Sequence, residues 1–484
     1  MAFRDLREFV DAAEALGEVK RLEGAHWDLE IGCITEIVAE QEGPMLLFDA
    51  IAGYPKGFRV AANPLGTAKR LALALGLPTD LSKMEILQAW REKNREMKPF
   101  PPDEVKTGPF MENVDEGGNI DLGKFPAPKW HELDGGRYIG TADMVVMKDL
   151  RSDWVNVGTY RASIVDEKRL TLWILEHHHG RQIALEYWKE GRACPVAMVL
   201  GCEPATWLAA PSAVKAGVSE YNYAGALRGA PVEVVRLPDT GLPVPATSEI
   251  AIEGEIPPPE EESAPEGPFG EWPGYYTHSG RECVLRVKRL FYRNDPILLG
   301  NPPLLPTTQR YGIPLFAARI WDHLENSGIS DVQAVWCHCH TLMIVIALRQ
   351  RYPGHATQAL TAAAGLQAGA SLYRYFVAVD EDIDPLDLNQ VLWAICTRVD
   401  PAESVQVLRS WSSDLDPRLP PDRREKGDFT MGRMLIDACK PFPWRERFPV
   451  ANRFSQEMKE KVWQKWADSL QRSDHVKSGR AKNG

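Results

Sequence analysis

The chain has 484 residues and a formal net charge of −11. This length exceeds one ordinary hydrophobic core and predicts about two to four domains. Hydrophobic residues make up 44% of the chain and charged residues 25%, values that are typical of a folded globular protein and argue against extensive disorder. The excess of acidic residues argues against a broad nucleic-acid surface and against binding to anionic membranes, although it is compatible with a small basic pocket for one phosphate.

No segment is typical of a membrane span or a secretion signal. The longest uninterrupted apolar run, residues 342–348, is far shorter than the roughly 20 residues that a bilayer requires. The charged N-terminus lacks the apolar core of a signal peptide. Eight cysteines are scattered without a CxxC pair, which does not suit a disulfide framework. We expect a cytoplasmic protein with no membrane partner and no nucleic-acid partner.

Helices and strands alternate in the first hundred residues, as their hydrophobic periodicity indicates. The expected elements are a helix over residues 6–16, a strand over 18–22, a helix whose apolar face carries Ile31, Ile34, Ile37 and Val38, strands over 45–48 and 59–62, and a helix that begins after Ser82. Ser82 and Glu85 have the spacing of a capping box. We predict an N-terminal α/β domain over residues 1–115 that has no glycine-rich nucleotide loop.

The pattern changes after residues 98–128, a segment rich in proline and polar residues that is typical of a linker. The next region contains short strand patterns over residues 141–147, 154–160, 170–175, 196–200, 232–235, 249–256, 283–292 and 297–299. Short strands at such spacing favour an antiparallel sheet or a barrel. We predict a central β domain over residues 116–305.

The last region returns to alternating helices and strands. The expected elements are a helix over 313–326, strands over 331–337 and 342–348, an alanine-rich helix over 357–370, strands over 375–379 and 391–397, and a helix from about residue 455. Residues 471–484 are basic and poor in apolar side chains, so we expect them to be frayed. We predict a C-terminal α/β domain with a terminal helix over residues 306–484, and an α+β fold for the whole chain.

The sequence EGPFGE, which begins at Glu266 and ends at Glu271, is the strongest local signal of chemistry. Gly267, Pro268 and Gly270 exclude a regular helix here, and a loop of this kind can bring its backbone close to a ligand. Two carboxylates can divide general acid and base work when their surroundings separate their pKa values. The alternative is a solvated turn in an acidic stretch.

Three further segments carry polar side chains suited to binding. Asn156 and Arg161 delimit NVGTYR, whose amide oxygen could bind a hard cation and whose guanidinium could bind a carboxylate or phosphate. Residues 177–179 are consecutive histidines, of which only His177 and His179 would share a face on a strand. Glu220 precedes a glycine-containing turn. Each segment also has a structural alternative. NVGTYR could be a polar strand end with a surface ion pair, the histidines could pack in the interior, and Glu220 could be an acidic residue at a helix N-terminus.

Other patterns exclude several classes of protein. The segment CHCH, residues 337–340, lacks the second separated ligand pair of a structural zinc site, so we favour packing at a strand end. The acidic turn 380–384 lacks the glycine and the terminal glutamate of a calcium loop. The motifs of kinases, Rossmann dehydrogenases, α/β-hydrolases and zincins do not occur in a suitable context.

In their order along the chain, these segments resemble the UbiD family of prenylated-flavin decarboxylases. The similar segments are DLREFVDAAEALGE, NVGTYR, EHHHGR, SEYNYAGALRG, VPATSEIAIEGEI, APEGPFGEWPGYY, YRNDPIL and VAVDEDIDP followed by VLWAICTR. The resemblance covers nearly the whole chain. It implies an N-terminal α/β domain, a central split β-barrel that binds the flavin, and a C-terminal α/β domain that takes part in oligomer contacts.

The resemblance also implies a cofactor site that holds prenylated FMN (prFMN). The family's divalent-metal ligands fall on Asn156, His179 and Glu220, where they would hold a Mn²⁺ or another divalent ion that bridges to the cofactor phosphate, with a K⁺ nearby. The other cofactor-binding positions would be Gly158, Thr159, Tyr160, Arg161, His178 and Arg181. Oxygen and imidazole ligands suit such a cation, whose charge offsets the phosphate.

The family's catalytic glutamate–arginine–glutamate set falls on Glu266, Arg161 and Glu271. Arg161 would hold the substrate carboxylate or the flavin edge, Glu271 would protonate the carbon after carbon dioxide leaves, and Glu266 would orient Arg161. The modified flavin would accept the electrons released on decarboxylation. We therefore expect a carboxy-lyase for an aromatic, heteroaromatic or α,β-unsaturated acid, supplied with cofactor by a flavin prenyltransferase and assembled as a homodimer or homohexamer.

The chain departs from the family pattern at several positions. Some relatives carry a lysine before the acidic turn, but residues 356–379 contain none; His178 stands where some relatives have glutamine. Trp272, which follows Glu271, could line a pocket for a flat substrate or pack into the barrel.

Three alternative functions stay open. They are an aryl-CoA decarboxylase or carboxylase in a multi-subunit complex, a non-catalytic flavin-storage protein, and a plain FMN oxidoreductase.

Overall fold

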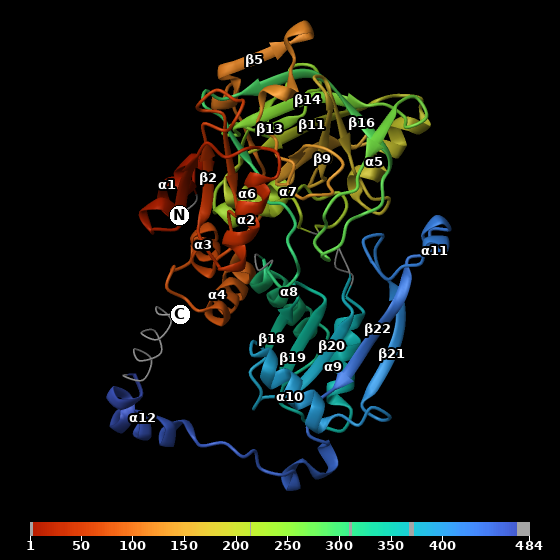
Figure 1. The fold of residues 1–484 in the computed structure, drawn as a ribbon. Helices are drawn as coiled ribbons and strands as arrows, with labels where there is room; N and C mark the ends of the chain where they lie inside the picture. The colour runs from red at the N-terminus through yellow and green to blue at the C-terminus, as the bar shows by residue number, and fades with distance from the viewer. Residues whose placement is uncertain (1–2, 213, 309–311, 367–371, 472–484) are drawn as a thin grey trace, which may run out of the picture. The chain divides into compact units, whose positions relative to one another are not determined.

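The computed structural model describes residues 3–212, 214–308, 312–366 and 372–471. The chain forms two compact units, residues 1–439 and residues 440–484. Within the first unit, Figure 1 shows strands of the N-terminal and central parts in red to green and the sheet of the C-terminal lobe in teal to blue. None of the described helices combines the length and the apolar character that a membrane span requires.

The N-terminal sheet has the strand order β1-β2-β3-β17. Its strands are β1 (Val19–Glu23), β2 (Met45–Asp49), β3 (Arg59–Ala62) and β17 (Ile297–Leu299), and its helices are α1 (Leu6–Ala15), α2 (Glu30–Glu40), α3 (Ala68–Ala74) and α4 (Lys83–Glu96). The capping box of Ser82 and Glu85 is confirmed at the start of α4. The face predicted for α2 is partly wrong, because Ile37 is 48% exposed and the helix instead buries Gly32, Thr35 and Ala39 beside Ile31.

A large curled sheet of mainly antiparallel strands forms the central part, in the order β6-β9-β10-β16-β14-β11-β7-β8, with β15 and β5 also paired to β16. Its strands are β5 (Asn113–Glu116), β6 (Tyr138–Gly140), β7 (Asp143–Lys148), β8 (Val155–Gly158), β9 (Ala162–Asp166), β10 (Arg169–Leu172), β11 (Cys194–Leu200), β14 (Ile250–Ile256), β15 (Ser263–Glu266) and β16 (Gly280–Tyr292). Alternate side chains of β7 enter two different hydrophobic cores, with Val145 in one and Val146 in the other. The sheet is therefore buried on both faces.

Two strands predicted for the central sheet lie elsewhere. Residues 297–299 form β17, which pairs in parallel with β3 of the N-terminal sheet. Residues 233–236 form β12 (Glu233–Arg236) of a small sheet with β13 (Pro243–Pro245) and β4 (Asp103–Glu104). Helices α5 (His179–Lys189), α6 (Pro204–Ala209) and α7 (Glu220–Arg228) connect strands of the central part. The strand pattern of a short apolar segment does not identify its pairing partner, which explains these errors.

The C-terminal lobe contains a sheet in the order β18-β19-β20-β22-β21. Its elements are α8 (Ile313–Asn326), β18 (Val332–His338), β19 (Met343–Leu348), α9 (His355–Ala364), β20 (Tyr375–Asp380), α10 (Leu388–Arg398), β21 (Val405–Trp411), α11 (Pro421–Glu425) and β22 (Thr430–Asp437). The strand predicted over 391–397 is wrong: this segment lies in α10, which buries Val391, Ala394 and Arg398 at helical spacing. Strands β21 and β22 were not predicted.

The second unit contains α12 (Gln456–Gln471). This helix confirms the terminal helix predicted from about residue 455. Of the segment 471–484, for which we predicted fraying, residues 472–484 lie outside the described residues. Of the predicted alanine-rich helix over 357–370, residues 357–364 lie in α9 and residues 367–370 are outside the described part.

Candidate active site

Arg161 lies between the two glutamates of the EGPFGE loop. Its Nε and Nη2 donate hydrogen bonds to Oε1 and Oε2 of Glu266 at 2.9 and 2.8 Å, and its Nη1 donates to Oε1 of Glu271 at 2.7 Å. Arg161 lies between β8 and β9, Glu266 ends β15, and Glu271 follows in the loop. The sheet thus brings together groups that are 105 and 110 positions apart in the chain, as the proposed catalytic set requires.

Burial and charge perturb this set. The exposed fractions of the side chains are 6% for Arg161, 2% for Glu266 and 11% for Glu271. Burial raises the pKa of Glu271, and the Arg161 charge opposes this rise only in part. The two carboxylates raise the pKa of Arg161 against the opposing effect of its burial. The site therefore contains a permanently charged arginine beside a carboxyl group that holds its proton more tightly than an exposed glutamate does.

The donors of Arg161 are mostly occupied by the protein itself. A guanidinium has five N–H donors. Four of them point to acceptors in the described residues, because Nη2 also donates to Oγ1 of Thr277 at 3.3 Å. The guanidinium carbon of Arg161 also lies over the Trp173 ring, 4.0 Å from its centroid. This arrangement fixes the guanidinium, and among the described residues one N–H of Nη1 has no acceptor in the protein.

Residues that the sequence did not indicate support the two glutamates. The hydroxyl of Tyr138 donates to Oε1 of Glu266 at 2.8 Å, and Asp134 accepts a hydrogen bond from the backbone N–H of Gly270 at 3.0 Å. Tyr138 and Asp134 lie more than a hundred positions before the loop. No local pattern marks them, because a single tyrosine at the start of a strand or a single aspartate in a turn has many structural uses.

Asn156 and Glu220 meet in a second buried cluster. The Asn156 Nδ2 donates to Oε1 of Glu220 at 2.9 Å, and the backbone N–H of Val157 donates to its Oε2 at 2.7 Å. Among the described residues, the buried Oδ1 of Asn156 has no hydrogen-bond partner. A buried acceptor without a partner is costly and fits a position that binds a ligand. The structure thus brings together two of the three predicted metal ligands.

His179, the third predicted metal ligand, is the first residue of α5. Its ring packs edge-on against Trp154, with centroids 5.1 Å apart. The histidines 177–179 do not lie on a strand, so the prediction that alternation would separate their faces is wrong. His178 is the N-cap residue of α5 and packs at 5.5 Å from the Tyr160 ring, and its burial lowers its pKa to about 4. His178 is therefore a neutral imidazole at physiological pH.

The backbone between β8 and β9 packs closely on the start of α5. A Cβ added to Gly158 would lie 2.4 Å from the Tyr160 hydroxyl, and one added to Gly180 would lie 2.7 Å from it. The same hydroxyl accepts a hydrogen bond from the Gly180 N–H at 3.2 Å. The Thr159 hydroxyl donates to the carbonyl of Asp143 at 3.0 Å. Glycine is thus required at position 158 for Tyr160 to reach α5.

The Arg181 side chain contacts the central sheet and not the cluster of Asn156 and Glu220. Its Nη1 lies 3.0 Å from Sγ of Cys283, and its guanidinium carbon lies 4.9 Å from the Trp188 ring centroid. No contact in the described residues joins Arg181 to Asn156 or Glu220. Its predicted place in a cofactor site therefore stays a prediction.

The CHCH segment lies at the end of β18 and packs there, as we favoured. The His338 Nε2 lies 2.8 Å from the carbonyl oxygen of Pro385, and Cys337 is buried. Among the described residues, no group of three or more His, Cys, Asp or Glu side chains could hold a metal ion. The His340 ring lies 4.9 Å from that of Trp272, so the tryptophan beside the predicted acid packs against the C-terminal lobe.

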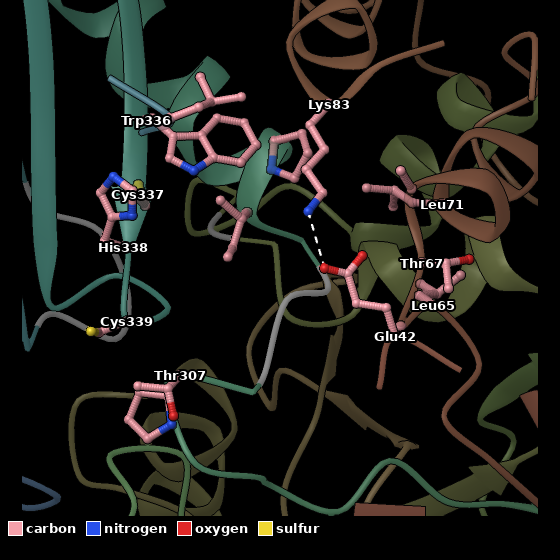
Figure 2. Close-up of a pocket in the computed structure, with 16 residues that line it drawn as sticks. Glu42, Leu65, Thr67, Leu71, Lys83, Thr307, Trp336, Cys337, His338 and Cys339 are labelled. Carbon is pink, nitrogen blue, oxygen red and sulfur yellow. Dashed lines mark hydrogen bonds and ion pairs between the residues drawn. The ribbon is translucent and has the colours of Figure 1, made fainter. Parts of the chain in front are cut away.

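A cavity of about 400 Å³ lies away from these groups, between helices of the N-terminal part and the C-terminal lobe (Figure 2). Lys83 and Glu42 form an ion pair of 3.4 Å at one wall, and Trp336, His338 and Cys339 lie at another. None of the predicted site residues lines it. The candidate site is therefore defined by its side-chain contacts and not by this cavity.

The sequence matches family descriptions in three consecutive stretches. Residues 10–90 match the N-terminal domain of 3-octaprenyl-4-hydroxybenzoate carboxy-lyase, residues 103–305 its Rift-related domain, and residues 312–438 its C-terminal domain, all of the UbiD family. These stretches follow the N-terminal sheet, the curled central sheet and the C-terminal lobe in order.

Individual proteins match over nearly their whole length. A pyrrole-2-carboxylic acid decarboxylase of Pseudomonas aeruginosa is 33% identical over 96% of this chain and 98% of its own. The vanillic acid decarboxylase of Sedimentibacter hydroxybenzoicus, solved in a closed form, has a TM-score of 0.82 and 28% identity over 96% of this chain and 99% of its own. An evolved dimeric form of the UbiD-class enzyme HmfF of Pelotomaculum thermopropionicum, in complex with prFMN, has a TM-score of 0.77 and 26% identity over 94% of this chain and 97% of its own. With the family resemblance of the sequence thus confirmed, the chain belongs to the UbiD family of carboxy-lyases.

Proposed function

We propose that this enzyme catalyses the reversible, non-oxidative decarboxylation of an aromatic, heteroaromatic or α,β-unsaturated carboxylic acid with prFMN as its cofactor. The buried contact of Arg161 with Glu266 and Glu271 is the observation that carries the proposal. The names of the relatives support the class of substrate, since they act on pyrrole-2-carboxylic and vanillic acids, and a related UbiD-class enzyme binds prFMN. When bound, prFMN would supply the electron sink for the bond that breaks.

The chain's own residues would place and move one proton. Glu271, whose pKa is raised by burial, would hold the proton and deliver it to the substrate carbon from which carbon dioxide has departed. Arg161 would keep the two carboxylates apart and stabilise the anion that Glu271 becomes, through the 2.7 Å contact of Nη1. Glu266, with both oxygens on Arg161, would set the orientation of the guanidinium.

Asn156, His179 and Glu220 would hold a divalent metal ion, with Mn²⁺ as our proposal. The buried Asn156 Oδ1 without a partner in the described residues supports this, because amide and carboxylate oxygens with one imidazole suit such an ion. Burial raises the pKa of Glu220 to about 7 in the metal-free protein, and a bound cation would favour its charged form. The metal would in turn attract a cofactor phosphate. The accompanying K⁺ stays a prediction without assigned ligands.

The broader setting of the enzyme also belongs to this proposal. We infer a cytoplasmic homodimer or homohexamer that receives its cofactor from a flavin prenyltransferase, and domain limits at residues 1–115, 116–305 and 306–484. Gly158, Thr159, Tyr160, His178 and Arg181 would complete the cofactor site. The close packing of Gly158 and Gly180 on Tyr160 supports a role for residues 158–160 in this site.

Replacement of Glu271 by glutamine tests the proposal. We expect E271Q, purified with its cofactor, to keep the visible spectrum of the wild type and to lose about 10²-fold or more of its carbon dioxide release on a panel of aromatic acids. The matched control is E260Q, in an exposed position of the same acidic stretch. Full activity of E271Q would overturn the role of Glu271. The absence of any carbon dioxide release from the cofactor-loaded wild type, also in the exchange direction with labelled bicarbonate, would overturn the proposed reaction.

A further inference from the structure

The turn between β18 and β19 has an unusual backbone. Cys339 and His340 have φ angles of 49° and 59°. In the described part of the chain, they form the only pair of consecutive non-glycine residues with positive φ. This left-handed region is unfavourable for a residue with a Cβ, and residues held there often serve a purpose outside the turn itself. We therefore ask which residues the side chains of this turn contact.

His340 contacts the aromatic residue that follows the proposed acid. Its ring centroid lies 4.9 Å from that of Trp272 with a tilt of 45°, and 5.3 Å from that of Phe316 in an edge-on arrangement. The His340 residue is 7% exposed. Offset and edge-on contacts at these distances are attractive and orient the rings. A side chain of this turn in the C-terminal lobe thus contacts the Trp272 ring.

Trp272 is directly coupled to the carboxylate of Glu271. The backbone N–H of Trp272 lies 3.4 Å from Oε2 of Glu271. The loop is closed by hydrogen bonds from the Glu271 N–H to the Tyr275 carbonyl at 3.0 Å and from the Gly274 N–H to the Glu271 carbonyl at 2.8 Å. A displacement of the Trp272 indole would therefore move the backbone that carries the acid and one donor to its carboxylate.

We propose that His340 is a positioning residue for the reaction: its ring holds Trp272 in place and so keeps the Glu271 carboxyl group directed at the substrate carbon. This inference rests on the proposed function for its catalytic consequence only. The contact itself is a property of the folded chain. The ring of His340, rather than its ability to carry a proton, does the work, because burial lowers its pKa to about 4 and keeps the imidazole neutral at physiological pH.

The consequence for the kinetics differs from that of a simple loss of folding. A proton donor that is displaced by a fraction of an ångström loses rate in the chemical step. Substrate binding depends on the remaining walls of the site and should change little. We therefore expect a loss of the ring at position 340 to lower kcat by about tenfold or more and to change KM by less than about threefold.

Substitution of His340 by asparagine or by phenylalanine separates the effect of its aromatic ring from the effect of its ring nitrogens. Asparagine tolerates the left-handed backbone but has no ring, whereas phenylalanine keeps a ring and has no ring nitrogen. His338 provides the matched control, because its ring lies in the same strand end but contacts the Pro385 carbonyl instead. The measurements are kcat and KM of the cofactor-loaded enzyme, the melting temperature, and amide hydrogen exchange of the segment 269–277.

In H340N we expect faster exchange of the amides of Glu271 and Gly274, by about fivefold or more, with the expected loss in kcat and unchanged exchange in β19. H340F and H338N should match the wild type within about twofold in both measurements. Wild-type exchange and kcat in H340N would overturn the inference, and so would an H340F enzyme as impaired as H340N. The exchange measurement needs no turnover: if the wild type releases no carbon dioxide, the proposed function fails, while exchange in H340N still decides whether His340 positions the loop.

Discussion

Replacement of Arg161 by methionine tests whether the buried cation holds two carboxylates in their charged arrangement. Methionine has a similar length but no donor and no charge. It would leave Glu266 and Glu271, with side chains 2% and 11% exposed, without the three hydrogen bonds of 2.7–2.9 Å that Arg161 donates to them. Removing one partner of a buried ion pair costs about 3–5 kcal/mol, because it leaves an uncompensated buried charge.

This cost can be converted into a melting temperature. An unfolding entropy of about 2 cal/mol/K per residue amounts to about 0.9 kcal/mol/K for the unit of residues 1–439. A loss of about 3–5 kcal/mol therefore predicts a decrease of about 3–6 °C at pH 8. Calorimetry or differential scanning fluorimetry of R161M and the wild type, at matched scan rates, measures it.

The decrease should depend on pH. In the unfolded chain a glutamate has a pKa of about 4.3. In folded R161M, burial would raise the pKa of Glu271 further above that value, because the Arg161 charge that opposes the rise is absent. The folded variant then binds more protons than the unfolded one, so its stability falls as pH rises from about 5 to 8. The melting difference from the wild type should thus be smaller at pH 5.5 than at pH 8.

A second substitution serves as the control. In R161M/E266Q one of the two uncompensated charges is absent, so the double variant should recover about half or more of the loss at pH 8. An equal melting difference at pH 5.5 and pH 8, or a double variant less stable than R161M, would refute the reasoning from buried charge.

Three further outcomes are expected. The kcat of the wild type should fall as pH rises, because Glu271 must be protonated to act as an acid and burial places its pKa above the ordinary value; initial rates of carbon dioxide release between pH 5 and 9 measure this, and a kcat that increases over that range contradicts it. N156A should retain less than about a tenth of the wild-type metal by elemental analysis, because the buried Oδ1 is lost; normal metal content would remove Asn156 from the ligands. G158A should lose flavin absorbance and about 1–3 kcal/mol of stability, since its Cβ would meet the Tyr160 hydroxyl at 2.4 Å. The control is G118A, whose Cβ meets nothing within 4 Å. Equal flavin absorbance and equal stability of the two variants would contradict the close packing of Tyr160 on Gly158.

The elements that the sequence predicted correctly have local causes. Helix α1 was expected from its apolar spacing, and it buries Leu6, Phe9, Val10 and Ala13 at that spacing. The capping box of α4 is a contact between neighbours in the chain. The segment 391–397 failed because a short apolar run fits a buried strand and a buried helix face equally well. Only packing against the rest of the C-terminal lobe decides between them.

The candidate site divides in the same way. EGPFGE could be identified as a loop with two carboxylates, because glycine and proline restrict the backbone locally. Asn156, Arg161 and Glu220 were assigned through the order of several motifs along the chain, and the structure brings Arg161 onto Glu266 and Asn156 onto Glu220. The start of α5 at His179 was missed, because consecutive histidines have no periodicity of their own.

By itself the sequence determined the family, the α+β class and the residue types available for proton transfer and metal binding, since these depend on composition, local spacing and the order of motifs. Only the tertiary structure decided which groups surround them. Tyr138 on Glu266, Thr277 on Arg161 and His340 on Trp272 all join segments distant in the chain. Burial and neighbouring charge set the pKa of Glu271, and both are properties of the packed interior that no local pattern of residues carries.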